Sequence, residues 1–170
     1  DRVRYLIVDG YNVIFAWPEL HALADSNLDA ARSRLMHILC NYGAFAKYEV
    51  VLVFDAYRVA DNPGRRFDFH NIHVVYTAKN ETGDLYIEKR IAEIGKNDQV
   101  RVVTSDGLIQ LSAVRSGVLR MSAMEFRREA ESVSAEIHEI LENLNRTHMG
   151  RIGERLRAET NARREKGPAK

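Results

Sequence analysis

Three aspartates at the ends of apolar runs are the side chains of this sequence best suited to chemistry. They are Asp9, Asp55 and Asp106, each preceded by a short, mostly apolar stretch. Such a stretch, when it meets a turn residue, is typical of a strand buried on both faces of a parallel sheet. The carboxyl ends of parallel strands lie along one edge of the sheet, so we expect these three carboxylates to converge there.

Two further acids are expected at the same edge. Glu81 and Asp84 lie three residues apart at the start of a predicted helix. Near the first aspartate, Gly10 allows a sharp turn, and Asn12 then places an amide side chain beside Asp9. Four or five carboxylates gathered in water repel one another unless divalent cations lie between them.

Ligands that offer only oxygen favour a hard cation such as Mg²⁺ or Mn²⁺. A cation of this kind lowers the pKa of an attacking water and stabilises a departing oxygen. The acids therefore predict hydrolysis of a phosphodiester bond.

The pattern of strands and helices explains why these acids should meet. The apolar runs that end at Asp9 and Asp55 flank a helical pattern that starts near Ser26, and such a βαβ unit requires parallel strands. Further strands are expected at residues 72–76, before Asp106 and at residues 118–121. The fold class is thus α/β, with a central, mainly parallel sheet of about five strands.

Two connections are predicted to be loops. Residues 13–18 form an apolar stretch in which Pro18 should break any helix. Residues 57–70 interleave aromatic residues with Arg58, Arg65 and Arg66, a mixture that suits RNA phosphates and stacked bases.

The C-terminal part of the chain is expected to be helical. Ser122 should cap a long amphipathic helix, and beyond Gly150 the tail is predicted to form one more helix.

Composition and charge narrow the class of protein. The 170 residues suit one core, and 45% hydrophobic with 29% charged residues is typical of a soluble globular chain. No apolar run approaches the roughly 18–20 residues that span a bilayer, so no membrane partner is expected. The single cysteine, Cys40, is predicted to be a core residue, in keeping with a reducing cytoplasmic location; an organelle stroma is the alternative.

The charge is unevenly distributed. Residues 146–170 contain eight Lys or Arg and three Glu, a net charge of +5, which leaves −4 for the remainder because the whole chain carries +1. We expect a domain at residues 1–147 and a basic tail at residues 148–170.

Four motifs surround the expected site: Leu6-Ile7-Val8-Asp9-Gly10-Tyr11-Asn12, Val53-Phe54-Asp55, Asn80-Glu81-Thr82-Gly83-Asp84 and Thr104-Ser105-Asp106. Together they resemble the signature of NYN domains, the PIN-like nucleases, and more narrowly the YacP/Rae1 group of bacterial endoribonucleases. The resemblance covers about residues 3–145. It implies a three-layer α/β/α fold of PIN-like type, metal-dependent RNA cleavage, and action on messenger RNA associated with the ribosome.

Carried over by position, the resemblance assigns the site. Asp9 and Asp84 are expected to hold Mg²⁺ or Mn²⁺ directly, and Glu81 and Asp106 to complete the catalytic site through metal or water. Asn12 and Ser105 would support them. Asp55 is open to two interpretations, a direct role or the capping of a loop. The expected RNA contacts are Tyr11, Arg58, Arg65, Arg66 and Lys79.

Other functions are weighed against this one. A non-catalytic RNA- or ribosome-binding module on the same fold would have lost an acid, and none is missing. A receiver-like phosphoacceptor domain needs paired acids after its first strand and a lysine after its fifth. This chain has Asp9-Gly10 and Arg120-Met121 at those places. A dinucleotide-binding enzyme is disfavoured because Gly-x-Gly-x-x-Gly is absent after the first strand.

Overall fold

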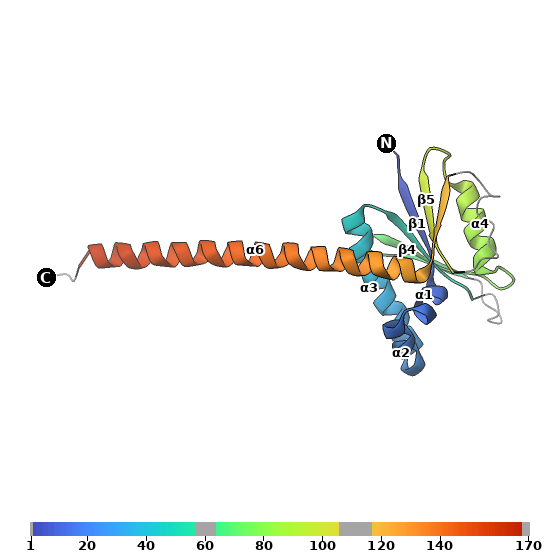
Figure 1. The fold of residues 1–170 in the computed structure, drawn as a ribbon, viewed down its shortest axis with the longest axis horizontal. Helices are drawn as coiled ribbons and strands as arrows, with labels where there is room; N and C mark the ends of the chain where they lie inside the picture. Colours follow the sequence, from blue (N-terminus) through green and yellow to red (C-terminus); the bar gives the residue numbers. More distant parts are fainter. Residues whose placement is uncertain (1, 57–63, 106–116, 168–170) are drawn as a thin grey trace. The chain divides into compact units, whose positions relative to one another are not determined.

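The computed structural model describes residues 2–56, 64–105 and 117–167 as strands, helices and short connections. Figure 1 shows their arrangement. In chain order the elements are β1 (Arg4–Asp9), α1 (Gly10–Ala16), α2 (Pro18–Ser26), α3 (Leu28–Ala46), β2 (Glu49–Phe54), β3 (Arg65–Phe69), β4 (Ile72–Tyr76), α4 (Gly83–Glu93), β5 (Gln99–Val103), β6 (Val118–Met121) and α6 (Ala123–Glu165).

The strands form one mainly parallel sheet, as predicted. In the described part of the chain the order is β3-β4-β2-β1-β5-β6. Strand β1 lies between β2 and β5 and is parallel to both. The carboxyl ends of these strands therefore share one edge, and this sheet geometry positions the acids that follow them.

Strand β3 differs from the prediction. The sequence indicated a loop over residues 57–70, but Arg65–Phe69 form an edge strand antiparallel to β4, with Arg65 opposite Tyr76. A turn at Asn71 joins the two strands. The sheet consequently has six strands rather than about five.

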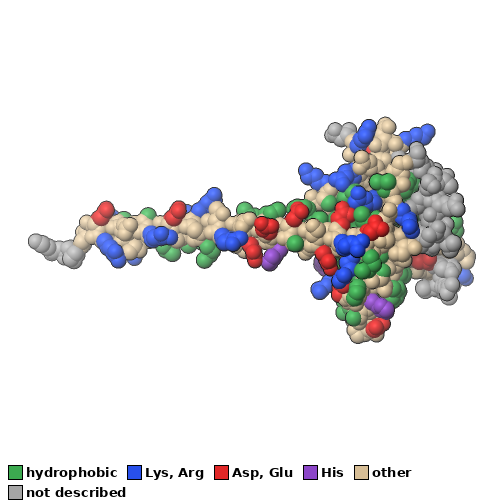
Figure 2. All heavy atoms as spheres, in the orientation of Figure 1, with side chains coloured by type: hydrophobic (Ala, Val, Ile, Leu, Met, Phe, Trp, Pro, Cys, Tyr) green, Lys and Arg blue, Asp and Glu red, His purple; other side chains and the backbone are tan. Residues whose placement is uncertain are grey.

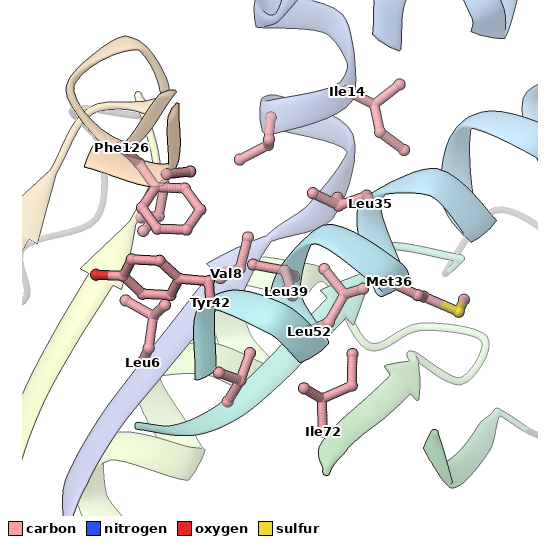
Figure 3. Packing of buried hydrophobic residues seen from close by; sticks show 14 of the residues in the cluster. Leu6, Val8, Ile14, Leu35, Met36, Leu39, Tyr42, Leu52, Ile72 and Phe126 are labelled. Carbon is pink, nitrogen blue, oxygen red and sulfur yellow. The ribbon is translucent and has the colours of Figure 1, made fainter. Parts of the chain in front are cut away.

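Helices cover both faces of the sheet and make the three layers that were expected. On one face, Leu6, Val8 and Leu52 pack with side chains from α1, α2, α3 and the first turns of α6 (Figure 3). On the other face, Ile7 and Val51 pack with α4 residues such as Ile87. Because successive side chains of β1 point to opposite, covered faces, its buried residues Leu6, Ile7 and Val8 are all apolar.

The prediction of a loop at residues 13–18 was wrong. Helix α1 starts directly after Asp9, and Val13 and Ile14 on it are fully buried. Pro18 does not break a helix, because it lies in the first turn of α2, where its missing N–H is not needed. The cysteine at position 40 is buried, as expected.

Helix α6 replaces the two helices that were predicted for the C-terminal part. It is continuous over 43 residues and contains Gly150. The chain divides into two compact units, Asp1–Val133 and Ser134–Lys170. The functional boundary between residues 147 and 148 stays a prediction. None of the described helices is apolar enough over a sufficient length to cross a membrane.

One histidine joins three strands and gives a prediction about pH. In β4, His73 Nδ1 lies 2.6 Å from Asp68 Oδ1 of β3, and Nε2 lies 3.2 Å from Glu49 Oε2 of β2. The Asp68 carboxylate above all raises the pKa of His73, and Glu49 adds to this effect against the opposing effect of burial. A raised pKa means that the charged imidazole stabilises the fold below the unfolded pKa of about 6.5, and that this contribution is lost as pH rises through the folded pKa.

We therefore expect His73→Gln to destabilise the protein more at about pH 6 than at about pH 8. The difference should be below about 1 kcal/mol, because all three side chains are roughly half exposed and solvent screens them. Urea unfolding at both pH values measures it. His148→Gln, on an exposed part of α6, is the control. An equal loss of stability at both pH values would contradict the prediction.

Candidate active site at the carboxyl edge of the sheet

Asp9 is the centre of the site and lies at the end of β1. Its side chain is half-buried, and Thr104 Oγ1, at the end of neighbouring β5, donates a hydrogen bond of 3.2 Å to Asp9 Oδ2. Thr104 is itself fully buried and its backbone N–H is bonded to Met121 O. The carboxylate is thus oriented by a fixed donor. Sequence reasoning did not single out Thr104, because a threonine at a strand end also fits as an ordinary β-former.

Asn12 and Ser105 join this edge to the helices on one side of the sheet. Asn12, in the first turn of α1, accepts a hydrogen bond of 2.9 Å at Oδ1 from the backbone N–H of Ser105. Ser105 Oγ accepts one of 3.4 Å from the N–H of Ala123 at the start of α6. The two residues that were predicted to support the site therefore bond to each other and tie Ser105 to the starts of α1 and α6.

Asp55 follows β2 and contacts the helix on the other side of the sheet. Its Oδ2 accepts a hydrogen bond of 2.9 Å from the backbone N–H of Gly83, the first residue of α4. A Cβ at Gly83 would lie 3.3 Å from Asp55 Cβ, so a small residue is needed there. This hydrogen bond caps the start of α4, and the choice between a direct role and a capping role for Asp55 stays a prediction. The positive end of the helix dipole also stabilises a carboxylate at this place.

Asp84 and Glu81 flank this helix start. Asp84 lies in the first turn of α4 and Glu81 just before it, and both side chains are half-exposed. Lys79 is exposed in the preceding turn. Asp106 and Arg58 belong to the predicted site as well, but they lie outside the residues that the structure describes.

Basic and aromatic side chains border the acids. Arg65, Arg66 and Glu81 help to line a hollow of about 200 Å³ beside Tyr76. The rings of Phe54 and Tyr76 are stacked, with their centroids 5.1 Å apart. The centroid of the Tyr11 ring lies 5.0 Å from that of Phe54. This arrangement keeps Tyr11, a predicted RNA contact, at the edge that carries Asp9.

An arginine from α3 was missed by the sequence reasoning. Arg32 Nε donates a hydrogen bond of 3.0 Å to Tyr11 Oη, and its guanidinium lies 5.6 Å from the centre of the Tyr11 ring. Burial is the largest single effect and opposes ionisation of Arg32. The hydrogen bond to Tyr11 and the charge interactions with Tyr11, Tyr76 and Asp29 together outweigh it, so the pKa of Arg32 is raised and the charge is retained. Burial raises the pKa of Tyr76. Nothing in the helical pattern of residues 28–46 marks position 32, because its partner is distant in sequence.

The donor atoms allow a test of whether a metal ion fits. Within the described ranges, no three side chains of His, Cys, Asp or Glu form a group that could hold one, and Asp106 is not part of that search. The oxygens of Asp9, Asp84 and Asn12 nevertheless match Mg²⁺. This ion is commonly bound through one or two carboxylates, with water and substrate phosphate as the other ligands. Asp9, Asp84 and Asn12 thus fit an open site, in which water and substrate supply the remaining ligands. Among the described residues they do not form a site in which the protein supplies every ligand.

A three-layer α/β/α fold with half-exposed carboxylates at the ends of parallel strands defines a nuclease-type scaffold. The chain belongs to the family of YacP-like NYN domains, whose family model matches residues 6–167. The resemblance seen in the four sequence motifs is thereby confirmed.

Known relatives agree in sequence and in structure. Protein YacP of Bacillus subtilis (strain 168) is 37% identical over 134 residues, which cover 78% of each chain. The crystal structure of Rae1 (YacP) from Bacillus subtilis is similar with a TM-score of 0.72 and 32% identity over 94% of both chains. A mutant of that protein gives a TM-score of 0.71 and 33% identity over 84% of both chains.

Proposed function

We propose that this protein is a metal-dependent endoribonuclease that hydrolyses phosphodiester bonds of RNA. The observation that carries the proposal is the orientation of Asp9 at the carboxyl edge of the sheet, together with the bond by which Asp55 fixes the start of the helix that carries Asp84. Asp9 is held by Thr104 at 3.2 Å, and Asp55 is held by the N–H of Gly83 at 2.9 Å. Membership of a nuclease-type family supports the same chemistry.

Each acid has a distinct role in the proposal. Asp9 and Asp84 hold the cation, and Glu81 and Asp106 complete the site directly or through water. A bound Mg²⁺ or Mn²⁺ would lower the pKa of the attacking water and stabilise the departing oxygen. Asn12 holds the backbone of Ser105 beside α1 through a bond of 2.9 Å. Asp55 fixes the start of α4 and so positions Asp84.

Substrate binding is assigned to the cations and aromatic rings beside the acids. Arg65, Arg66 and Lys79 are exposed and would contact phosphates. Tyr11 would stack on a base, with Arg32 holding its hydroxyl at 3.0 Å. This surface suits single-stranded RNA, because stacking on a ring requires an unpaired base.

The proposed substrate is messenger RNA on or near the ribosome, in the cytoplasm. The basic residues of α6 support this assignment, since Lys and Arg bind the phosphate backbone of RNA regardless of sequence. Figure 2 shows basic side chains along α6.

The test is cleavage of a labelled circular single-stranded RNA, which an endonuclease can open and an exonuclease cannot. The reactions contain Mg²⁺ or Mn²⁺, EDTA, or EDTA followed by excess metal, and a second series adds translating ribosomes. Cleavage that disappears with EDTA and returns with metal supports the proposal, and the series in which it occurs shows whether the ribosome is required. Folded protein that binds RNA without cleaving it in either series would favour the non-catalytic binding module.

Three arginines on one face of α6 provide a prediction about binding. Arg146, Arg157 and Arg164 are 11 and 7 residues apart, spacings that bring them to one side of a helix. Replacing all three by Gln should weaken RNA binding at low salt and lower the slope of log affinity against log salt by up to about 2, because each phosphate contact with a single strand contributes about 0.7 to the slope. Fluorescence anisotropy with a labelled RNA at several salt concentrations measures the slope.

The matched control removes three charges of the opposite sign from the same helix. Glu154→Gln, Glu159→Gln and Glu165→Gln should leave binding equal or stronger. An unchanged salt slope in the arginine variant would remove α6 from the RNA-binding surface.

A further inference from the structure

The second unit of the chain carries an apolar stripe, which we define as Ile140, Leu141, Leu144, Met149, Ile152 and Leu156. At about 100° per residue these side chains spread over roughly half of the circumference of α6, with Ile140 and Met149 at the two edges of the stripe. Their side chains are between 38% and 65% exposed. Half of the exposed large hydrophobic residues in the described part of the chain fall within these 17 positions. Such a concentration marks an interaction surface rather than scattered exposure.

The same segment gains little stability from packing within the chain. The buried residues of α6 are Ala123, Phe126 and Ala130, all in its first turns. Farther along, Gly150 and Gly153 each lower helix stability by about 1 kcal/mol relative to alanine. A helix of this kind depends on burial of its apolar side for stability. A partner on the stripe would supply that burial.

The charges on the segment identify the partner. Residues 134–145 contain three Glu and no Lys or Arg, a net charge of −3. Residues 146–166 contain seven Lys or Arg and three Glu, a net charge of +4. A second α6 in antiparallel orientation places each acidic half against a basic half, whereas a parallel one places like charges together. Charges beside an apolar seam commonly decide helix orientation in this way.

We propose that two copies of this chain associate through an antiparallel pairing of their α6 stripes. The contact is isologous, because the same surface of each copy serves both sides of a two-fold axis. RNA is a poorer match for the stripe, since the acidic half repels phosphate and the apolar side chains offer it nothing. The arginines nearest the stripe, Arg151, Arg155 and Arg163, are separate from those assigned above to RNA.

The test uses the full chain and measures its mass by sedimentation and light scattering without RNA. Wild type is expected to show twice the chain mass of 19.4 kDa at high concentration and to dissociate on dilution. Replacing Leu141 and Leu144 by Ser should weaken association at least about tenfold, because the centre of the seam becomes polar. Ala135→Ser with Asn143→Ser, away from the stripe, is the control. Far-UV circular dichroism checks that the helix is retained.

Charge reversal tests the orientation. Changing Glu136 and Glu142, which flank the stripe, to Lys should weaken the dimer at least about tenfold, and so should changing Arg151, Arg155 and Arg163 to Glu. Both sets combined in one chain should restore it, because the two halves are complementary again. In a parallel pair neither reversal would matter, so an unchanged dimer in both would overturn the antiparallel arrangement. A monomeric wild type at all concentrations, or one that grows in mass only when single-stranded RNA is added, would overturn self-association.

Discussion

Asp9→Asn is expected to lower RNA cleavage by at least about a hundredfold, because a neutral amide binds a hard cation far more weakly than a carboxylate does. The substitution preserves the shape of the side chain. Its oxygen can still accept the hydrogen bond that Thr104 donates over 3.2 Å, so the fold should be retained. The loss should fall on the chemical step and on metal affinity more than on RNA binding.

Single-turnover cleavage of labelled RNA over a range of Mn²⁺ concentrations measures this effect. Asp25→Asn removes the same charge from an exposed position on α2 and should cleave like wild type. Equal unfolding curves for both variants exclude a folding defect. Full activity of Asp9→Asn at low metal concentration would show that the cation lies elsewhere.

Gly10→Ala is expected to destabilise the protein by about 3 kcal/mol through a clash at the first residue of α1. An added Cβ would lie 2.5 Å from Phe54 Cε1 and 3.1 Å from Leu52 Cδ1. The Phe54 ring is fully buried and packs between Tyr11 and Tyr76, so it has no room to move. Alanine is the better helix former by about 1 kcal/mol, but the clash outweighs that gain.

Urea unfolding of the two variants Gly10→Ala and Gly150→Ala provides the comparison. Gly150 has no heavy atom within 4 Å of an added Cβ, so alanine there should not destabilise the protein. Adding Phe54→Leu to Gly10→Ala should recover part of the lost stability, because a smaller side chain leaves space. A stability of Gly10→Ala within about 0.5 kcal/mol of wild type would mean that the ring adapts.

The sheet could be predicted from the sequence because its strands are buried on both faces. The stretches that became β1, β2, β4 and β5 are apolar almost throughout, which is the pattern of central parallel strands. The edge strand β3 was missed for the opposite reason. Its residues alternate between exposed and half-buried, and the arginines and aspartate among them resemble a surface loop.

The helices next to the site were harder to predict. Helix α1 has only seven residues, too few for a helical period to be recognised, and the proline that follows it was taken as a break rather than as a helix start. In α6, Gly150 was taken as a boundary, although an isolated glycine is tolerated inside a long helix.

The shared edge of Asp9 and Asp55 could be predicted from topology, since Asp9 ends β1 and Asp55 directly follows the neighbouring β2. The groups that donate hydrogen bonds to these carboxylates could not be predicted in this way. The hydroxyl of Thr104 and the N–H of Gly83 lie 95 and 28 residues from the carboxylates that they contact. No local pattern reveals such pairs, because only the packed sheet brings them together.

The hydrogen bonds at Ala123 have a consequence for the order in which the protein forms during synthesis. Its N–H is bonded to Ser105, and its carbonyl accepts a bond of 2.7 Å from Trp17 Nε1, 106 residues earlier in the chain. Strand β1 likewise acquires its second neighbour only when β5 has been made. Contacts between residues so distant in sequence form late. The growing polypeptide can therefore orient Asp9 through Thr104 only after β5 has been made.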